Sequence, residues 1–155
     1  MAKRKKTSTK AHFLTALTVT RSAIEAKKLV YVLTANKKIS YSKGKSRIVY
    51  IGTTTKGLKR VASSAAAKAV SILTMKGINK LSAYILTYKG VHGLSNTHKH
   101  LERAAITVFK LQYGDIPLAN KQGVDILSAH KEFKYFDPKN VLKKLNKFEE
   151  LNEKE

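Results

Sequence analysis

Two short β-rich apolar runs constrain the fold of this chain more than any other feature of its sequence. They are LVYVL at 29–33 and RIVYI at 47–51, and the stretch between them is polar, basic and rich in turn-forming residues. Aromatic and β-branched runs bounded by Asn, Ser and Gly are typical of strands joined by a turn. We therefore expect an antiparallel hairpin with a long basic tip.

Helical and strand periodicity predict the other elements. Apolar residues recur at helical spacing in several segments, whereas LSAYILTY at 81–88 is typical of a third strand. We expect helices over 11–28, 56–75, about 97–113, and from Asp137-Pro138 onward. The hydroxyls of 53–55 should cap the second of these helices, and Ser95 or Thr97 the third. This order favours an α+β fold, with a small antiparallel three-stranded sheet flanked by helices.

The chain has 155 residues, which suits one domain with short tails. Residues 1–10 (MAKRKKTSTK) are expected to form a disordered basic tail, either a solvated charge run or a phosphate-binding arm. The domain itself is expected over 11–136. In 137–155 we expect a C-terminal helix whose apolar residues either dock on the core or form a homodimer interface. Those residues are Val141, Leu142, Leu145 and Phe148.

The charge of the chain is strongly asymmetric. Its 31 Lys and Arg against 10 Asp and Glu give a formal net charge of +21, and the first 101 residues, with Glu25 as their one acid, carry +20 of it. Such a surface attracts polyanions, above all nucleic acid. A membrane partner is not expected, because no apolar run approaches the ~20 residues of a membrane span and no basic amphipathic segment pairs Lys or Arg with a bulky apolar face. The absence of Cys excludes disulfides, thiolate metal sites and cysteine catalysis, and fits a cytoplasmic compartment, with a nuclear or viral context left open.

Glu102 is the first acidic residue after Glu25, so 76 consecutive positions carry no acid. On the expected helix it shares a line with apolar residues, where a carboxylate needs a compensating cation. That cation is either a Lys or Arg in a salt bridge or a hard divalent ion such as Mg²⁺. His98 lies four residues earlier and could share a metal or pass a proton, or it could be an exposed residue at the start of the helix.

Several short motifs occur in an order that resembles the GIY-YIG nuclease family. Leu29-Val30-Tyr31 stands for the first motif, with Leu-Val in place of Gly-Ile, and Val49-Tyr50-Ile51-Gly52 for the second. Arg60 follows that glycine by eight residues, Glu102 lies on a later helix, and Asn120 comes shortly after a proline. The resemblance covers about residues 29–123. The histidine that some members carry after the arginine has no counterpart near Arg60.

The resemblance implies a small stand-alone endonuclease, restriction-like or homing-like, that cleaves nucleic acid, with double-stranded DNA as the expected substrate. Glu102 would hold one Mg²⁺ or Mn²⁺, and Arg60 would bind the scissile phosphate through its planar fork. Tyr31 or Tyr50 would orient or deprotonate the water, which requires a phenol whose pKa is lowered by nearby cations. Gly52, His98 and Asn120 would support the site. Without the resemblance, the tyrosines read as strand residues that pack the sheet.

Basic residues near these motifs are the expected contacts to nucleic acid. They are Lys43, Lys45, Arg47, Lys56, Lys59 and Lys68. The same cations would also suit a protein that binds nucleic acid without cleaving it, either on DNA or as a component of an RNA assembly. The combination of Tyr31, Tyr50, Arg60 and Glu102 favours the enzyme.

Overall fold

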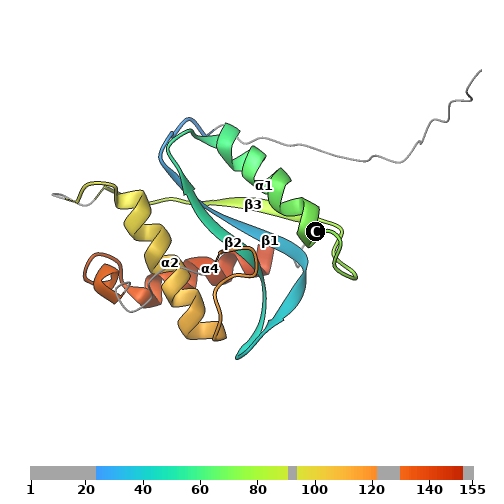
Figure 1. Ribbon diagram of the computed structural model, residues 1–155. Helices are drawn as coiled ribbons and strands as arrows, with labels where there is room; N and C mark the ends of the chain where they lie inside the picture. The colour runs from blue at the N-terminus through green and yellow to red at the C-terminus, as the bar shows by residue number, and fades with distance from the viewer. Residues whose placement is uncertain (1–23, 91–93, 122–129, 152–155) are drawn as a thin grey trace, which may run out of the picture.

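Strong β propensity in the two apolar runs produces a hairpin, to which a third strand is added. The computed structural model describes residues 24–90, 94–121 and 130–151. Its sheet consists of β1 (Leu29–Tyr41), β2 (Gly44–Thr54) and β3 (Leu81–Leu86), in the order β2-β1-β3 with both pairs antiparallel (Figure 1). The predicted α+β fold with a small antiparallel sheet flanked by helices is confirmed.

The central strand β1 is buried on both faces, and alternate side chains enter two separate clusters. Val30 and Val32 belong to one cluster, and Tyr31 and Leu33 to the other. A strand with a helical layer on each side is expected to read as a continuous apolar run, as LVYVL does. The burial of β1 on both faces therefore explains why this run lacks the alternation of a half-exposed strand.

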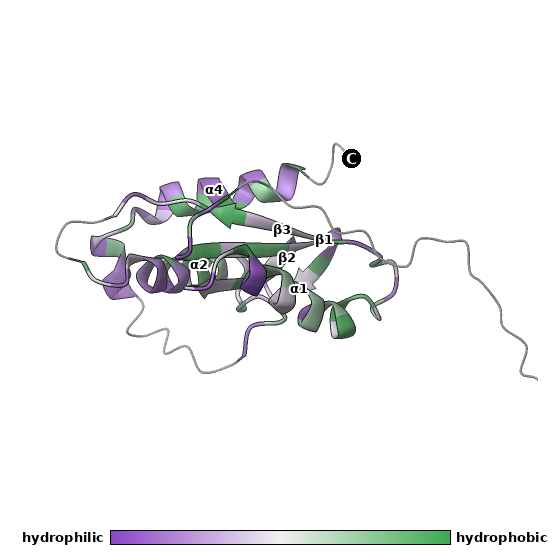
Figure 2. Cartoon of the chain, turned by 90° about the horizontal axis from the view of Figure 1, so that it is seen from above, coloured by the Kyte–Doolittle hydropathy of each residue, from purple (hydrophilic) through white to green (hydrophobic). Residues whose placement is uncertain are grey.

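Helices cover the two faces of the sheet. The cluster of Tyr31 is closed by α1 (Leu58–Ile72), and the opposite cluster by α2 (Thr97–Tyr113) and α4 (Pro138–Leu151). Figure 2 shows the strands between α4 and α1. A 3₁₀ turn, η1 (His130–Lys134), precedes α4. Val141 and Leu145 of α4 are buried in the core of a single chain.

The hairpin differs from the expected one at its tip. Its strands continue to Tyr41 and from Gly44, so the connection is short, and the expected long basic tip is wrong. Tyr41 supplies the physical reason. Its ring packs edge-on against Phe109 at 5.1 Å between centroids, and its hydroxyl donates a hydrogen bond to the Ile48 carbonyl at 2.7 Å. These contacts tie the distal part of the hairpin to α2 and extend the sheet.

The helix expected over 11–28 is not supported by its described part. Residues 11–23, like the basic tail, lie outside the described residues, and 24–28 have no helical structure. Their backbone instead bonds to distant segments, because Gly57 N–H donates to the Lys27 carbonyl at 2.9 Å and the Tyr88 hydroxyl to the Lys28 carbonyl at 3.3 Å.

Within the described ranges, no helix is both long enough and apolar enough to cross a bilayer.

The two expected side-chain caps do not form. Helix α1 begins after Gly57, whose φ is +65°, and α2 begins after Asn96, whose φ is +56°; neither helix has a capping side-chain hydrogen bond or an acidic residue in its first turn. The hydroxyl of Thr54 accepts from Lys56 N–H instead, one turn before α1 starts. No capping side chain and no acidic residue of the first turn therefore offsets the partial positive charge of either N-terminus.

Candidate functional site

A bulge in β2 places Tyr50 on the α1 face of the sheet. Leu33 pairs with Tyr50 and Thr34 with Ile48, so Val49 is the extra residue of β2. Val49 and Tyr50 consequently both lie against the cluster that contains Tyr31. The two tyrosine rings, which the sequence placed on neighbouring strands, are 5.8 Å apart between centroids at an interplanar angle of 45°.

Gly52 makes room for the ring of Tyr50. It is the direct partner of Tyr31 in the β1–β2 ladder. A Cβ atom at position 52 would lie 2.5 Å from Tyr50 Cε1 and 2.7 Å from its hydroxyl oxygen. The glycine of the second motif is thus needed for a close approach of the tyrosine ring to the backbone.

The hydroxyl of Tyr50 is strongly held in its protonated form. Burial, followed by the neighbouring Tyr31 hydroxyl, raises the pKa of Tyr50 to about 12, and a hydrogen bond with Ser64 opposes the rise. Lys68 Nζ lies 4.8 Å from the centre of the ring, at a distance suited to a cation–π contact. The expectation of a lowered tyrosine pKa is therefore wrong for Tyr50, because burial and the neighbouring Tyr31 raise its pKa by more than the hydrogen bond with Ser64 lowers it.

Glu102 lies beside the end of β2. Its carboxylate accepts a hydrogen bond from Thr53 N–H, and burial raises its pKa to about 7, against the opposing effects of Arg103, this hydrogen bond and Lys99. Across the described segments, no Lys, Arg or His nitrogen forms an ion pair with Glu102. The salt-bridge alternative is thus not found there, and the desolvated carboxylate remains available to a cation.

Asn120 closes the free edge of β2 between Tyr50 and Gly52. Its Oδ1 accepts from Ile51 N–H at 3.0 Å, and its Nδ2 donates to the Ile51 carbonyl at 2.7 Å. Ala119 N–H adds a bond to the Val49 carbonyl at 2.8 Å. Asn120 therefore acts as a side-chain substitute for another strand, and it fixes the backbone that carries the second motif.

Replacing Asn120 with Ala should lower the free energy of unfolding by about 1–2 kcal/mol, because Ile51 loses two partners at once. Urea titration of the variant measures the loss. Asn120→Asp keeps an acceptor but no donor, so its free energy of unfolding should lie between those of the wild type and Asn120→Ala. Asn146→Ala, on the exposed side of α4, is the control. Equal stability of Asn120→Ala and Asn146→Ala would contradict the bracing role.

The raised pKa of Glu102 predicts a pH-dependent stability. The folded chain binds its proton up to about pH 7, whereas the unfolded chain releases it near 4.5. Between these values the folded state binds more protons, so stability falls as the pH rises. Glu102→Gln should remove this fall and be more stable than wild type at pH 8 by about 1–3 kcal/mol, with little difference at pH 4.5. Urea unfolding at both pH values tests this, and a wild type equally stable or more stable at pH 8 would contradict it.

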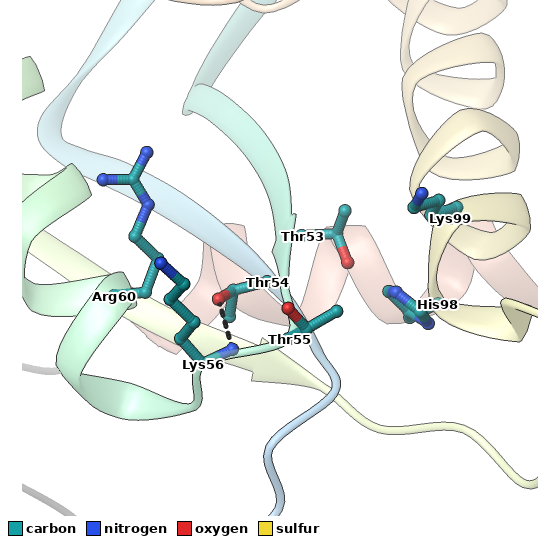
Figure 3. Close-up of a pocket in the computed structure, with 7 residues that line it drawn as sticks. All are labelled: Thr53, Thr54, Thr55, Lys56, Arg60, His98 and Lys99. Carbon is teal, nitrogen blue, oxygen red and sulfur yellow. Dashed lines mark hydrogen bonds between the residues drawn. The ribbon is translucent and has the colours of Figure 1, made fainter.

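An open pocket of about 320 Å³ lies where β2 leaves the sheet, between the first turns of α1 and α2. Figure 3 shows Arg60 and Lys56 on the α1 side, His98 and Lys99 on the α2 side, and a run of threonines between them. His98 is only 1% exposed, and neither ring nitrogen has a hydrogen-bond partner in the described chain. Burial, then Lys28, Lys99 and His100, lower the pKa of His98. His98 is thus a buried, neutral imidazole, which corrects the alternative of an exposed residue at the helix start.

The six basic residues expected to contact nucleic acid fall into separate groups. Lys56 and Lys59 are exposed at the start of α1, near Arg60, and Lys68 is on the same helix. The exposed Lys43 and Lys45 lie at the opposite end of the hairpin, roughly 30 Å away at 3.3 Å per residue. The half-buried Arg47 donates a hydrogen bond to the Asn36 carbonyl, so its guanidinium braces the hairpin.

Sequence reasoning missed two groups that the structure adds to the site. Ser64, buried on α1, bonds to the Tyr50 hydroxyl. A signal was available, because Arg60, Ser64 and Lys68 are spaced by four residues and share one helix face. The N–H of Thr53 had no such signal, since it depends on α2 lying beside the edge of β2.

The donor set at Glu102 suits a hard cation held by few protein ligands. Within the described ranges, no group of three or more His, Cys, Asp or Glu side chains could hold a metal ion. Mg²⁺ commonly uses one or two carboxylates and completes its shell with water and substrate phosphates. A single desolvated carboxylate that accepts one hydrogen bond fits this mode of binding, and it does not fit a closed protein cage.

In comparisons with known proteins, no family model, no curated protein and no solved structure matches this chain.

Proposed function

We propose that this protein is a metal-dependent endonuclease that hydrolyses phosphodiester bonds, with double-stranded DNA as its substrate. The observation that carries the proposal is the convergence of Tyr31, Tyr50 and Glu102 around Gly52 and Thr53. These are residues of the motifs that resemble the GIY-YIG family. A protein that only binds nucleic acid has no need for a desolvated carboxylate, which repels phosphate, beside this basic surface.

Glu102 is the residue that would hold Mg²⁺ or Mn²⁺. When bound there, the ion would neutralise charge on the phosphoryl group and on the leaving 3′ oxygen. The support from this chain is electrostatic. Burial that raises the pKa of Glu102 to about 7 makes its ionised form costly, and a bound cation would relieve that cost.

Arg60 and Tyr50 have separate tasks in this proposal. The exposed guanidinium of Arg60 would bind two phosphoryl oxygens of the scissile group in a bidentate manner. Tyr50, whose pKa is about 12, would keep its proton and orient the attacking water by hydrogen bonding. Tyr31, which is 2% exposed, would hold the ring of Tyr50 in place.

The surface charge supports nucleic acid as the partner. The first 101 residues carry a formal charge of +20, and the exposed lysines at the start of α1 lie beside Arg60. The lysines at the start of α1 and those at the distal end of the hairpin, about 30 Å apart at 3.3 Å per residue, would give a duplex two cationic contacts. A reducing compartment such as the cytoplasm suits a chain that has no cysteine.

The test is incubation of the full chain with supercoiled plasmid, with a linear duplex and with single-stranded RNA, each in Mg²⁺, in Mn²⁺ and in EDTA. We expect nicked or linear plasmid only with a divalent ion. Electrophoretic shift of the same duplex in EDTA reports binding separately. Binding without cleavage in either ion would overturn the endonuclease and leave the non-catalytic binder, and cleavage that persists in EDTA would overturn the role of the metal.

A further inference from the structure

The pocket at the end of β2 has a side that the proposed chemistry does not use. Arg60 and Lys56 line it from α1, but His98 and Lys99 line it from α2, and no carboxylate is among its lining residues. Figure 3 shows the imidazole of His98 directed toward Thr53 and Thr55 and away from the body of α2.

His98 is the most informative residue of this side. A buried polar group without a partner is costly, so native structures rarely keep one without a reason. Both ring nitrogens of His98 lack a partner in the described chain, although the residue is 1% exposed and borders an open pocket. A ligand with hydrogen-bonding atoms in the pocket would satisfy the ring.

The charges around His98 favour an anion as that ligand. Lys28, Lys99 and His100 are the charged or titratable neighbours that lower its pKa, after burial. Lys56 and Arg60 add two cations across the pocket. The charged side chains that line the pocket are all cations, so a phosphate group would be attracted to them.

The backbone adds hydrogen-bond donors and partial positive charge to the pocket. Both α1 and α2 start next to the pocket, and neither has a capping side chain or an acidic residue in its first turn. Uncapped helix N-termini present N–H groups and partial positive charge, which suit a phosphate. The hydroxyl of Thr55, exposed at the pocket, is a further donor.

We propose that the α2 side of this pocket, formed by His98, Lys99 and Thr55, is a second phosphate site that holds a backbone phosphate of the bound nucleic acid next to the one that Arg60 binds. The inference depends on the proposed function only in taking nucleic acid as the ligand. The second site would hold the nucleic-acid strand on the other side of Thr53 from Arg60. The scissile phosphate would then always lie at the same position relative to Glu102 and Tyr50.

The test uses the imidazole signals of the full chain in EDTA, so that no cleavage occurs. Long-range ¹H–¹⁵N spectra are recorded during titration with inorganic phosphate, and with chloride at equal ionic strength. We expect a saturable shift of His98 with phosphate alone. Lys99→Ala should weaken the apparent phosphate affinity about fivefold or more, while Lys143→Ala on the exposed side of α4 should leave it unchanged. A His98 signal that is indifferent to phosphate would overturn the site.

A second titration with a short duplex in EDTA identifies the source of the phosphate. The His98 signal should move as it does with inorganic phosphate, and Lys99→Ala should reduce the salt dependence of duplex binding by about one unit of slope. A response to inorganic phosphate but not to the duplex would overturn a nucleic-acid phosphate site in favour of a free anion.

The failure of this proposal is separable from that of the endonuclease. A duplex that moves His98 but is never cut in Mg²⁺ or Mn²⁺ would overturn the enzyme and retain the site. Cleavage by a protein whose His98 signal does not respond to the duplex would overturn the second phosphate site and retain the enzyme.

Discussion

Glu102→Gln should abolish cleavage of supercoiled plasmid, with a rate at least about 100-fold below wild type in Mg²⁺. Gln keeps the size of the side chain and an oxygen that can accept from Thr53 N–H, but it loses the charge that holds a divalent ion. The rate is measured from the disappearance of supercoiled DNA under single-turnover conditions.

Two further measurements separate lost chemistry from lost structure. Duplex binding by Glu102→Gln in EDTA should equal or exceed that of wild type, because a negative charge near phosphate has been removed. Its stability at pH 8 should not fall, since the ionised carboxylate is the costly form in the folded chain. Glu150→Gln, an exposed change on α4, is the matched control and should cut normally. Cleavage by Glu102→Gln at the rate of Glu150→Gln would overturn the role of Glu102.

The order of elements was predictable because it depends on local patterns. The runs at 29–33 and 47–51 have strand propensity whatever surrounds them, and the periodic apolar residues of α2 and α4 define their buried faces. The motif order then linked residues far apart in the chain. Both kinds of signal are present in the sequence itself.

The electrostatic state of the site could not be predicted in this way. The pKa of Tyr50 depends on burial under α1 and on the ring of Tyr31, and that of Glu102 on the approach of α2 to the edge of β2. These are tertiary contacts, and the burial that they cause raises both pKa values, whereas the cationic composition had led to the expectation of a lowered tyrosine pKa. The β-bulge that sets Val49 and Tyr50 against one residue of β1 likewise could not be predicted, because a run of apolar residues carries no signal for it.

Gly52→Ala should disturb the site through Tyr50 alone. The φ angle of Gly52 is not among the positive values of the described glycines, so alanine carries no backbone strain there. Its Cβ would, however, lie 2.5 Å from Tyr50 Cε1, and the ring would have to leave its place between Tyr31 and Lys68. We expect a loss of about 1–3 kcal/mol in the free energy of unfolding, together with a cleavage rate close to that of Tyr50→Ala.

A double-mutant cycle tests this cause directly. If the Tyr50 ring is the group that alanine displaces, Gly52→Ala should cost less than half as much in a Tyr50→Ala background, where the ring is absent. Gly90→Ala is the matched control, because a Cβ at that position would meet no atom within 4 Å. Additive losses from Gly52→Ala and Tyr50→Ala would mean that the glycine is required for another reason. A non-additive cycle, with cleavage lost in each single variant, would instead assign the glycine of the second motif to the placement of the tyrosine beside it.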